Sequence, residues 1–255
     1  MRIFALLLVS SMLSFPSFGW GLTGHRAIGL IAQQHLTKKT KRKLREILKH
    51  ESLAVASVWM DEVKSDSAYN HMTDWHWVTI GDGKTYAEME KNPNGDVIQT
   101  LNRVIDELES GTLSIEEQKI NIKILVHLIG DIHMPLHVGK GDDIGGNAVK
   151  VRFFGDDTNL HTVWDSKIID SKKFSYSELA AAIDHFDTES LVEQWQNDDV
   201  MVWVEESISY RKLVYDLPND KYIGYYYIYD AWPVIQDRLH KAGVRLAGVL
   251  NKIYE

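Results

Sequence analysis

The chain has 255 residues, of which 44% are hydrophobic and 25% are charged, a balance typical of a globular protein with one sizeable core. Its formal net charge of −8 argues against a protein that holds nucleic acid on a broad basic surface. The sequence contains no cysteine, which excludes disulfides, thiolate metal sites and cysteine nucleophiles.

The first 19 residues have the pattern of a secretory signal peptide. Arg2 supplies a positive start, residues 4–15 form an apolar run, and the letters SFG at 17–19 make a small-x-small cleavage site. A membrane anchor is the alternative, but the apolar run is short for a membrane span. We therefore expect a cleaved signal peptide over residues 1–19, one domain over 20–255, and export to the periplasm or the extracellular space.

Helical patterns dominate the rest of the chain. The basic run at residues 38–43 precedes the apolar Leu44, Ile47 and Leu48, and we interpret it as the solvated face of a helix. The alternative is a dense positive patch that binds a partner. Later, Ser114 and Glu117 form a capping box before a long apolar-periodic stretch.

Proline and further caps delimit the remaining helices. Pro135 should end the helix that follows Ser114. Ser175 with Glu178 opens another helix, and we expect further helices at about 189–195 and 200–215. The C-terminal segment should form a helix that carries Pro233 in its first turn or is kinked there.

Strand-like alternation is scarce. Ala148 to Phe154 is the best candidate and is expected to form half of a small hairpin, after a turn at residues 142–147. We therefore predict an all-α fold, a mostly helical single domain with a minor β-hairpin.

Histidine and aspartate recur in patterns suited to metal binding. His127 and Asp131 lie four residues apart on one face of a predicted helix, and His161 and Asp165 repeat that spacing. A lone histidine on such a helix is more often a hydrogen-bonded core residue. Imidazole and carboxylate without cysteine form the donor set of a hydrolytic zinc site, and the set is too large for one zinc. It comprises His25, Asp61, His76, His127, Asp131, His137, His161 and Asp165.

Six motifs extend this pattern along the chain. They are WGLTGHRAIGLIA (20–32), SVWMDEVK (57–64), DWHWV (74–78), HLIGDIHMPLHVG (127–139), GGN (145–147) and NLHTVWD (159–165). In their order and spacing the chain resembles the S1/P1 family of zinc-dependent nucleases between residues 20 and 165. The C-terminal third is compatible with that family but less diagnostic.

The resemblance implies a mostly helical fold of the phospholipase C/P1 nuclease type with three zinc ions per chain. It assigns one zinc to Asp61, His76, His127 and Asp131, and a second to His137, His161 and Asp165. It assigns the third to His25, Asp131 and the amino group and carbonyl of Trp20. This last site requires Trp20 to be the N-terminal residue, and the signal-peptide pattern predicts cleavage at the same bond.

The resemblance also implies roles around the phosphate. Lys64 would stabilise charge at the phosphate as a catalytic residue that also binds substrate, and Asp61 would orient the attacking hydroxide besides binding zinc. Trp77 would stack on a base and Asn147 would contact it. From the residues alone, Lys64 can equally be an ordinary surface lysine. Trp77 is more simply interpreted as a core tryptophan, and Asn147 beside glycine is also compatible with an ordinary turn.

Two positions fall outside these roles. Thr79 stands where some fungal relatives carry an aspartate that contacts the base, so their base preference does not transfer to this chain. His133 is not a ligand position in the family, and we expect it to be structural or to support a ligand.

Three hypotheses for function follow. The first is a secreted zinc endonuclease, monomeric and without stable membrane association, whose substrates are single-stranded nucleic acid and 3′-nucleotides. It would yield 5′-phosphorylated products and have 3′-nucleotidase activity. The second is a zinc-dependent phospholipase C, and the third is a non-catalytic protein with closed zinc coordination. The motifs DWHW and GGN, together with Lys64, favour the nuclease.

Overall fold

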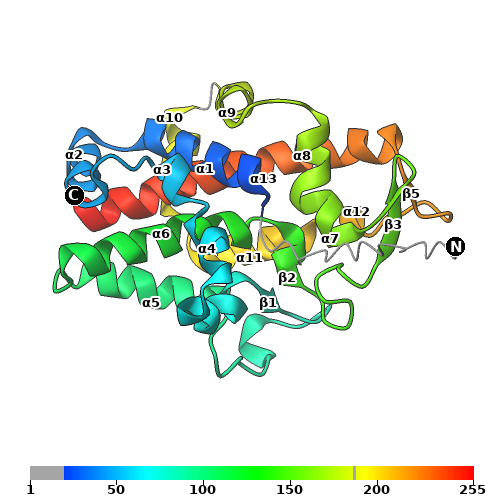
Figure 1. Ribbon diagram of the computed structural model, residues 1–255, viewed down its shortest axis with the longest axis horizontal. Coiled ribbons are helices and arrows are strands. Elements are labelled where there is room, and N and C mark those ends of the chain that lie inside the picture. Colours follow the sequence, from blue (N-terminus) through cyan, green and yellow to red (C-terminus); the bar gives the residue numbers. More distant parts are fainter. Residues whose placement is uncertain (1–19, 186–187) are drawn as a thin grey trace, which may run out of the picture.

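The structure, a computed structural model, describes residues 20–185 and 188–255, so the expected signal peptide at 1–19 lies outside the described residues. Figure 1 shows a bundle of helices with small sheets at its lower and right-hand edges. The longer helices are α1 (Leu22–His35), α2 (Lys38–Leu48), α5 (Val97–Glu109), α6 (Ile115–Ile132), α9 (Tyr176–Ile183), α10 (Glu189–Asn197), α11 (Val200–Ser209) and α13 (Tyr225–Tyr254).

Shorter segments connect these helices. The short α-helices are α3 (Leu53–Ala56), α4 (Trp59–Glu62), α7 (Leu160–Thr162), α8 (Ile168–Ser171) and α12 (Arg211–Val214). Segments of other helix types are the 3-10 helices η1 (Val63–Ser65), η2 (Ser67–His76), η3 (Tyr86–Glu88) and η4 (Pro135–His137) and the π-turn η5 (Val163–Lys167). The strands are β1 (Val78–Thr79), β2 (Val138–Gly139), β3 (Lys150–Phe153), β4 (Asp156–Asn159) and β5 (Tyr222–Ile223). The prediction of a mostly helical fold with a minor β-hairpin is confirmed.

Helix α6 forms the centre of the bundle. Every residue from Asn121 to Ile132 is buried, so this half of the helix is covered all round. Helices α1, α3, α4, α5 and α13 pack against it. His127 and Asp131 therefore lie in the interior of the molecule.

The predicted helix starts are confirmed at two capping boxes. Ser114 N–H donates to the Glu117 carboxylate at 2.8 Å, and Glu117 N–H donates back to the Ser114 hydroxyl at 3.3 Å. Ser175 and Glu178 make the same pair of bonds at the start of α9. Helix α6 ends at Ile132, before the proline that was expected to stop it.

The stretch expected to be one helix over 200–215 is interrupted. It forms α11 and α12, which are separated at Tyr210. The Arg211 guanidinium donates to the carbonyls of Val138 and Gly139 at 2.6 and 2.9 Å. These long-range bonds orient α12 toward β2. The hydrophobic pattern of residues 200–215 could not predict them, because their acceptors lie in another segment of the chain.

Pro233 lies two turns inside α13, so its expected place in the first turn is wrong. The helix begins earlier, at Tyr225. The carbonyl that loses its partner at this proline belongs to Tyr229, and both residues are exposed. Because water can satisfy that carbonyl, the helix continues through the proline.

The predicted hairpin is present and is extended by a third strand. β3 pairs antiparallel with β4, with Lys150 opposite Asn159. The connecting Phe154 and Gly155 both have positive φ, as a two-residue type I′ turn requires. β5 adds to the other edge of β3 in parallel.

A second, unpredicted pairing matters more for the site. β1 and β2 pair in parallel, with Val78 opposite Val138. Val78 follows the segment with His76 and Trp77, and Val138 follows His137. The pairing therefore brings together two parts of the chain that are 60 residues apart.

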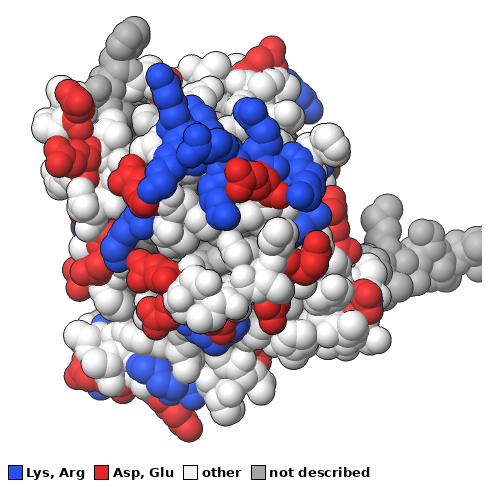
Figure 2. All heavy atoms as spheres, turned by 90° about the vertical axis from the view of Figure 1, so that its left-hand side faces the viewer, with Lys and Arg blue, Asp and Glu red and all other residues white. Residues whose placement is uncertain are grey.

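The basic run at residues 38–43 lies on the exposed side of α2, as predicted. Leu44, Ile47 and Leu48 are buried on the inner side. Figure 2 shows Lys and Arg side chains gathered on this end of the molecule. None of the helices within 20–185 and 188–255 combines the length and the apolar character of a membrane span.

Candidate metal centre

The eight side chains of the predicted ligand set lie together in the middle of the molecule. They come from α1, α4, η2, α6, η4, α7 and η5. Their nitrogen and oxygen donors form three groups, and within each group the donors lie within 4.8 Å of one another. The groups are His25 with Asp61 and His127, His76 with His127 and Asp131, and His137 with His161 and Asp165.

The group around Asp131 has the spacing of ligands on one metal ion. Asp131 Oδ2 lies 2.9 Å from His76 Nδ1 and 3.3 Å from His127 Nε2. The two imidazole nitrogens are 3.1 Å apart. Donors on a zinc tetrahedron with bonds of about 2.0–2.1 Å lie roughly 3.3 Å apart. The three atoms therefore fit a single zinc ion.

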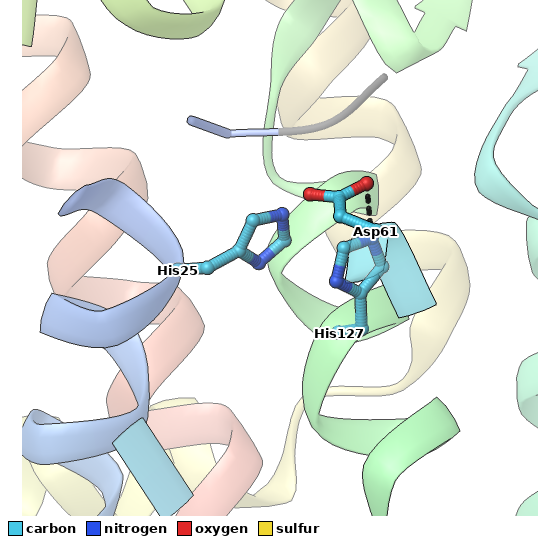
Figure 3. Close-up of side chains that lie close together, drawn as sticks. All are labelled: His25, Asp61 and His127. Carbon is cyan, nitrogen blue, oxygen red and sulfur yellow. Dashed lines mark ion pairs between the residues drawn. The ribbon is translucent and has the colours of Figure 1, made fainter. Parts of the chain in front are cut away.

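His25 and Asp61 both lie close to His127, as Figure 3 shows. Asp61 Oδ1 is 3.8 Å from His127 Nε2, the ion pair drawn as a dashed line. The rings of His25 and His127 stack with centroids 4.0 Å apart. Both ring nitrogens of His25 are buried and make no hydrogen bond within the described parts of the chain. Buried polar atoms of this kind need a partner, and a metal ion would supply one.

Asp131 lies between the groups. Its Oδ2 faces His76 and His127, while its Oδ1 lies 3.3 Å from His25 Nε2 and 3.7 Å from His137 Nδ1. The side chain is fully buried. One carboxylate with its two oxygens turned to different sets of imidazoles has the geometry of a bridging ligand.

The third group depends on a glycine turn. The rings of His137 and His161 stack with centroids 5.1 Å apart. Gly145 has φ +56°, and a Cβ there would lie 2.5 Å from the Leu136 carbonyl oxygen. Glycine therefore permits the close approach that lets the Gly145 carbonyl accept a hydrogen bond from His161 Nδ1 at 2.7 Å.

Backbone carbonyls orient three of the five imidazoles of the centre. His127 Nδ1 donates to the Ser57 carbonyl, His137 Nδ1 to the His76 carbonyl, and His161 Nδ1 to the Gly145 carbonyl, each at 2.7 Å. A proton held on Nδ1 leaves the Nε2 lone pair for a metal. The buried His161 Nε2 has no hydrogen-bond partner among the described residues.

The electrostatics keep most of these imidazoles neutral. Burial lowers the pKa of His76 to about 4 and that of His137 to about 3. Burial also lowers the pKa of His25 and of His161. Neutral imidazole is the form that binds metal, so these groups are ready to coordinate at neutral pH.

The pKa values of the carboxylates shift in the direction opposite to the one that burial would cause. Burial alone would raise the pKa of Asp131, but the charge of the neighbouring His127 holds it well below its usual range. Burial would likewise lower the pKa of His127, but the charges of Asp131 and Asp61 raise it. Buried carboxylates that stay ionised beside imidazoles form a site that favours a cation.

Trp20 begins the described chain at the edge of this centre. Its side chain is fully buried. The N–H of the next residue, Gly21, donates to the Asp165 carbonyl at 2.8 Å. The start of the chain is therefore tied to the segment that carries the third group.

Lys64 lies beside Asp61, on the side of the centre that reaches solvent. Its ammonium donates to Asp61 Oδ1, and both side chains are partly exposed. Burial would raise the pKa of the Asp61 carboxyl, but the charges of His127 and Lys64 lower it. Asp61 therefore stays ionised with one oxygen close to a cation.

A cavity of about 210 Å³ opens next to the third group. Its lining includes His137 and His161 together with Trp77, Asn147 and the exposed Thr79. Asn147 Nδ2 donates to the Ile144 carbonyl at 3.0 Å, within its own turn. The cavity thus places both predicted base-contacting residues next to predicted metal ligands.

Ile144 also lines this cavity and was not among the predicted residues. Its side chain is 70% exposed and its φ is +54°, a conformation that β-branched residues avoid. The unusual backbone presents an apolar side chain at the mouth of the cavity. The sequence DDIGG predicts positive φ at its two glycines. It does not predict a positive φ at the isoleucine, so this residue could not be found from the sequence.

His133 is absent from the three groups, in line with the prediction for it. Its Nδ1 donates to the Ile129 carbonyl at 2.7 Å, and the Arg245 guanidinium lies 3.0 Å from its Nε2. Burial and the charges of Arg238 and Arg245 hold the pKa of His133 well below its usual value. It is a neutral structural residue at the end of α6.

The chain is similar in sequence to known nucleases. The profile of the family described as S1/P1 Nuclease matches residues 20–255. The chain is 30% identical to Endonuclease 3 of Arabidopsis thaliana, over 97% of this chain and 93% of that protein. It is 28% identical to Nuclease S1 of Aspergillus oryzae, over 93% and 92% of the two chains. It is also 28% identical to Nuclease P1 of Penicillium citrinum, over 58% and 57%.

Proposed function

The chain belongs to the S1/P1 nuclease family of zinc-dependent hydrolases, and we propose that it hydrolyses single-stranded DNA and RNA to 5′-phosphorylated products and removes 3′-phosphates from nucleotides. The observation that carries this proposal is the convergence of eight imidazole and carboxylate side chains, from seven segments, into three adjacent donor groups. Groups this close suit a substrate phosphate that contacts several metal ions at once.

We assign three zinc ions to these eight side chains together with Trp20. The first would be held by Asp61, His76, His127 and Asp131, and the second by His137, His161 and Asp165. The third would be held by His25, Asp131 and the amino group and carbonyl of Trp20. The donor spacings around Asp131, the buried nitrogens of His25 and the bond from Gly21 to Asp165 support this assignment.

When bound, zinc ions lower the pKa of a shared water and stabilise the charge that develops on phosphate. The protein supplies the remaining functions. Asp61 is ionised and partly exposed, so it can orient the attacking water and accept a hydrogen bond from it. Lys64 holds a positive charge beside the same carboxylate, where it stabilises the phosphate during reaction.

We assign substrate selection to the cavity beside the third group. Trp77 supplies a half-exposed ring on which a base can stack, which suits activity on many sequences. Asn147 supplies an amide for the base edge. Thr79 provides a hydroxyl in place of a carboxylate, so we expect a base preference different from that of relatives with aspartate there.

We further propose that the protein is exported as a monomer after cleavage between Gly19 and Trp20. The amino group required by the third zinc exists only after this cleavage. The signal-peptide pattern of residues 1–19 supports the same bond.

One set of assays tests the function. The mature protein from Trp20 onward is depleted of metal, reloaded with zinc, and incubated with single-stranded DNA, RNA, a 3′-mononucleotide and phosphatidylcholine. We expect zinc-dependent release of 5′-phosphorylated ends from the polymers and of phosphate from the mononucleotide. Release of phosphocholine alone would instead establish a phospholipase, and no turnover with tightly bound zinc would establish a non-catalytic protein.

A further inference from the structure

A second cluster of potential metal ligands lies outside the centre described above. It consists of His35, Asp184 and His240, whose donor atoms all lie within 4.8 Å of one another. His35 is the last residue of α1, Asp184 directly follows α9, and His240 lies in the middle of α13. Figure 1 shows α9 lying against α1 and α13, and the three helices pack together.

The spacing within this cluster matches that of the catalytic groups. Asp184 Oδ1 lies 2.8 Å from His35 Nε2 and 3.4 Å from His240 Nε2. The corresponding distances around Asp131 run from 2.9 to 3.7 Å. Both are close to the roughly 3.3 Å expected between donors on a zinc tetrahedron.

Burial and charge favour a cation here. The side chains of Asp184 and His240 are 11% and 9% exposed, and that of His35 is 20% exposed. Burial alone would raise the pKa of Asp184, but the neighbouring imidazoles of His240 and His35 lower it. The carboxylate is thus ionised and largely removed from water. Its ion-pair partners within residues 20–185 and 188–255 are these two imidazoles.

We propose that His35, Asp184 and His240 bind a divalent transition-metal ion, zinc in preference to magnesium or calcium, at a structural site separate from the catalytic centre. Two imidazoles and one carboxylate suit zinc and its late first-row neighbours, whereas magnesium and calcium favour all-oxygen sites. The remaining solvent access at His35 leaves room for a water as fourth ligand.

The position of the site explains what this ion does. His25 and His35 lie ten residues apart on α1, which separates them by about 15 Å along the helix. The proposed ion therefore fixes the C-terminal end of the same helix whose N-terminal end carries His25. It ties α1 to α9 and α13, so its loss loosens the bundle without removing a catalytic ligand.

Metal counting tests the proposal. The zinc-loaded mature protein is dialysed against metal-free buffer, and zinc per chain is measured by mass spectrometry for the wild type, His240→Gln and Asp184→Asn. We expect one equivalent less zinc in each variant than in the wild type. His50→Gln changes an exposed histidine outside the cluster and should leave the count unchanged. An equal count in the wild type and both variants would overturn the proposal and leave a hydrogen-bonded triad.

A second measurement covers the case in which a variant does not fold. Crystals of the wild-type protein are measured on both sides of the zinc absorption edge. An anomalous peak between His35, Asp184 and His240 is expected, and its absence from crystals with zinc in the catalytic centre would refute the site. Since nuclease activity is not the readout, this result is independent of the proposed reaction.

Discussion

Asp131 is the carboxylate that faces the largest number of imidazoles in the centre. Its two oxygens lie within 3.7 Å of nitrogens from His25, His76, His127 and His137. Replacing one oxygen by an amide NH₂ would remove the negative charge and one of the oxygens that could bind a metal ion. We therefore expect this residue to be the most sensitive single position of the site.

We predict that Asp131→Asn lowers kcat/KM for single-stranded DNA at least 100-fold and reduces bound zinc by more than one equivalent. Loss of an outer-shell partner alone already lowers metal affinity or activity by about 10- to 100-fold, and this residue is placed as a direct ligand of two ions. Zinc content and steady-state kinetics measure both effects. Asp106→Asn, which changes an exposed aspartate on α5, is the control. A variant with full zinc content would contradict the bridging role.

Lys64 contributes charge rather than metal ligation in our proposal. We predict that Lys64→Gln lowers kcat about 100-fold, as loss of one preorganised charge-stabilising group typically does, while zinc content stays unchanged. Lys64→Arg should recover part of the activity because it keeps the charge. Lys84→Gln changes an exposed lysine and serves as the control. Equal kcat values for Lys64→Gln and the wild type would remove Lys64 from the mechanism.

At the scale of elements, α1 and α6 approach each other through a glycine. A Cβ on Gly130 would lie 2.8 Å from His25 Nδ1 and 2.9 Å from its Cε1. Both residues are fully inside the bundle. Because Gly130 has no side chain, the His25 ring can lie against α6 at this position.

We predict that Gly130→Ala reduces zinc binding by displacing His25, although alanine favours a helix by about 1 kcal/mol over glycine. Thermal unfolding and zinc content of the variant measure the balance between the clash and the helix propensity. Gly81→Ala, where a Cβ meets no atom closer than 3.6 Å, is the matched control. An increase in stability with full zinc content would show that the two helices separate at little cost.

The C-terminal end of α6 is held by a buried ion-pair network from α11 and α13. Arg238 and Arg245 are fully buried and both donate to Glu206. Arg238 also donates to the His133 carbonyl at 3.1 Å. This network fixes the turn at His133, between Asp131 and His137, so the proposed metal ligands depend on Arg238 and Arg245, which lie 105 and 112 positions from His133.

Glu206 gives this network a pH dependence. Burial would raise its pKa, but hydrogen bonds and charges from Arg245 and Arg238 lower it to about 2. Because the folded-state pKa lies below the usual value near 4.5, the stabilisation is complete above that value and disappears as the pH falls toward 2.

We predict that Glu206→Gln lowers the free energy of unfolding by about 3 kcal/mol at pH 7, since it leaves two buried guanidinium groups under-compensated. The difference from the wild type should shrink as the pH falls from about 5 toward 2. Urea unfolding of the metal-free proteins at several pH values measures this difference. Glu205→Gln, an exposed neighbour, is the control. A difference that does not change with pH would contradict the assigned ion pair.

For the whole molecule, the chain start is part of the active centre in our proposal. Adding one alanine before Trp20 moves the amino group away and should reduce bound zinc by one equivalent and activity strongly. The same residue added after Glu255 should change neither, since that end lies beside α2 at the far left of Figure 1. Zinc content and DNA hydrolysis are measured for both proteins. Unchanged values for the N-terminal extension would refute ligation by Trp20.

The sequence by itself determined the helical class, the two capping boxes, the hairpin and the pairing of His127 with Asp131. These depend on interactions over four residues or fewer, or on two-residue turns, so local patterns record them. The resemblance to a family then extended the ligand set to segments that periodicity could not connect.

The tertiary structure alone decided how those segments meet. The tertiary contacts are the pairing of β1 with β2, the bonds from Arg211 at the break after Tyr210, the carbonyls that orient His127 and His137, and the meeting of His35 with His240. They join residues 60 to 205 positions apart. Such contacts depend on the packing of complete helices against one another, and no short stretch of sequence contains both partners.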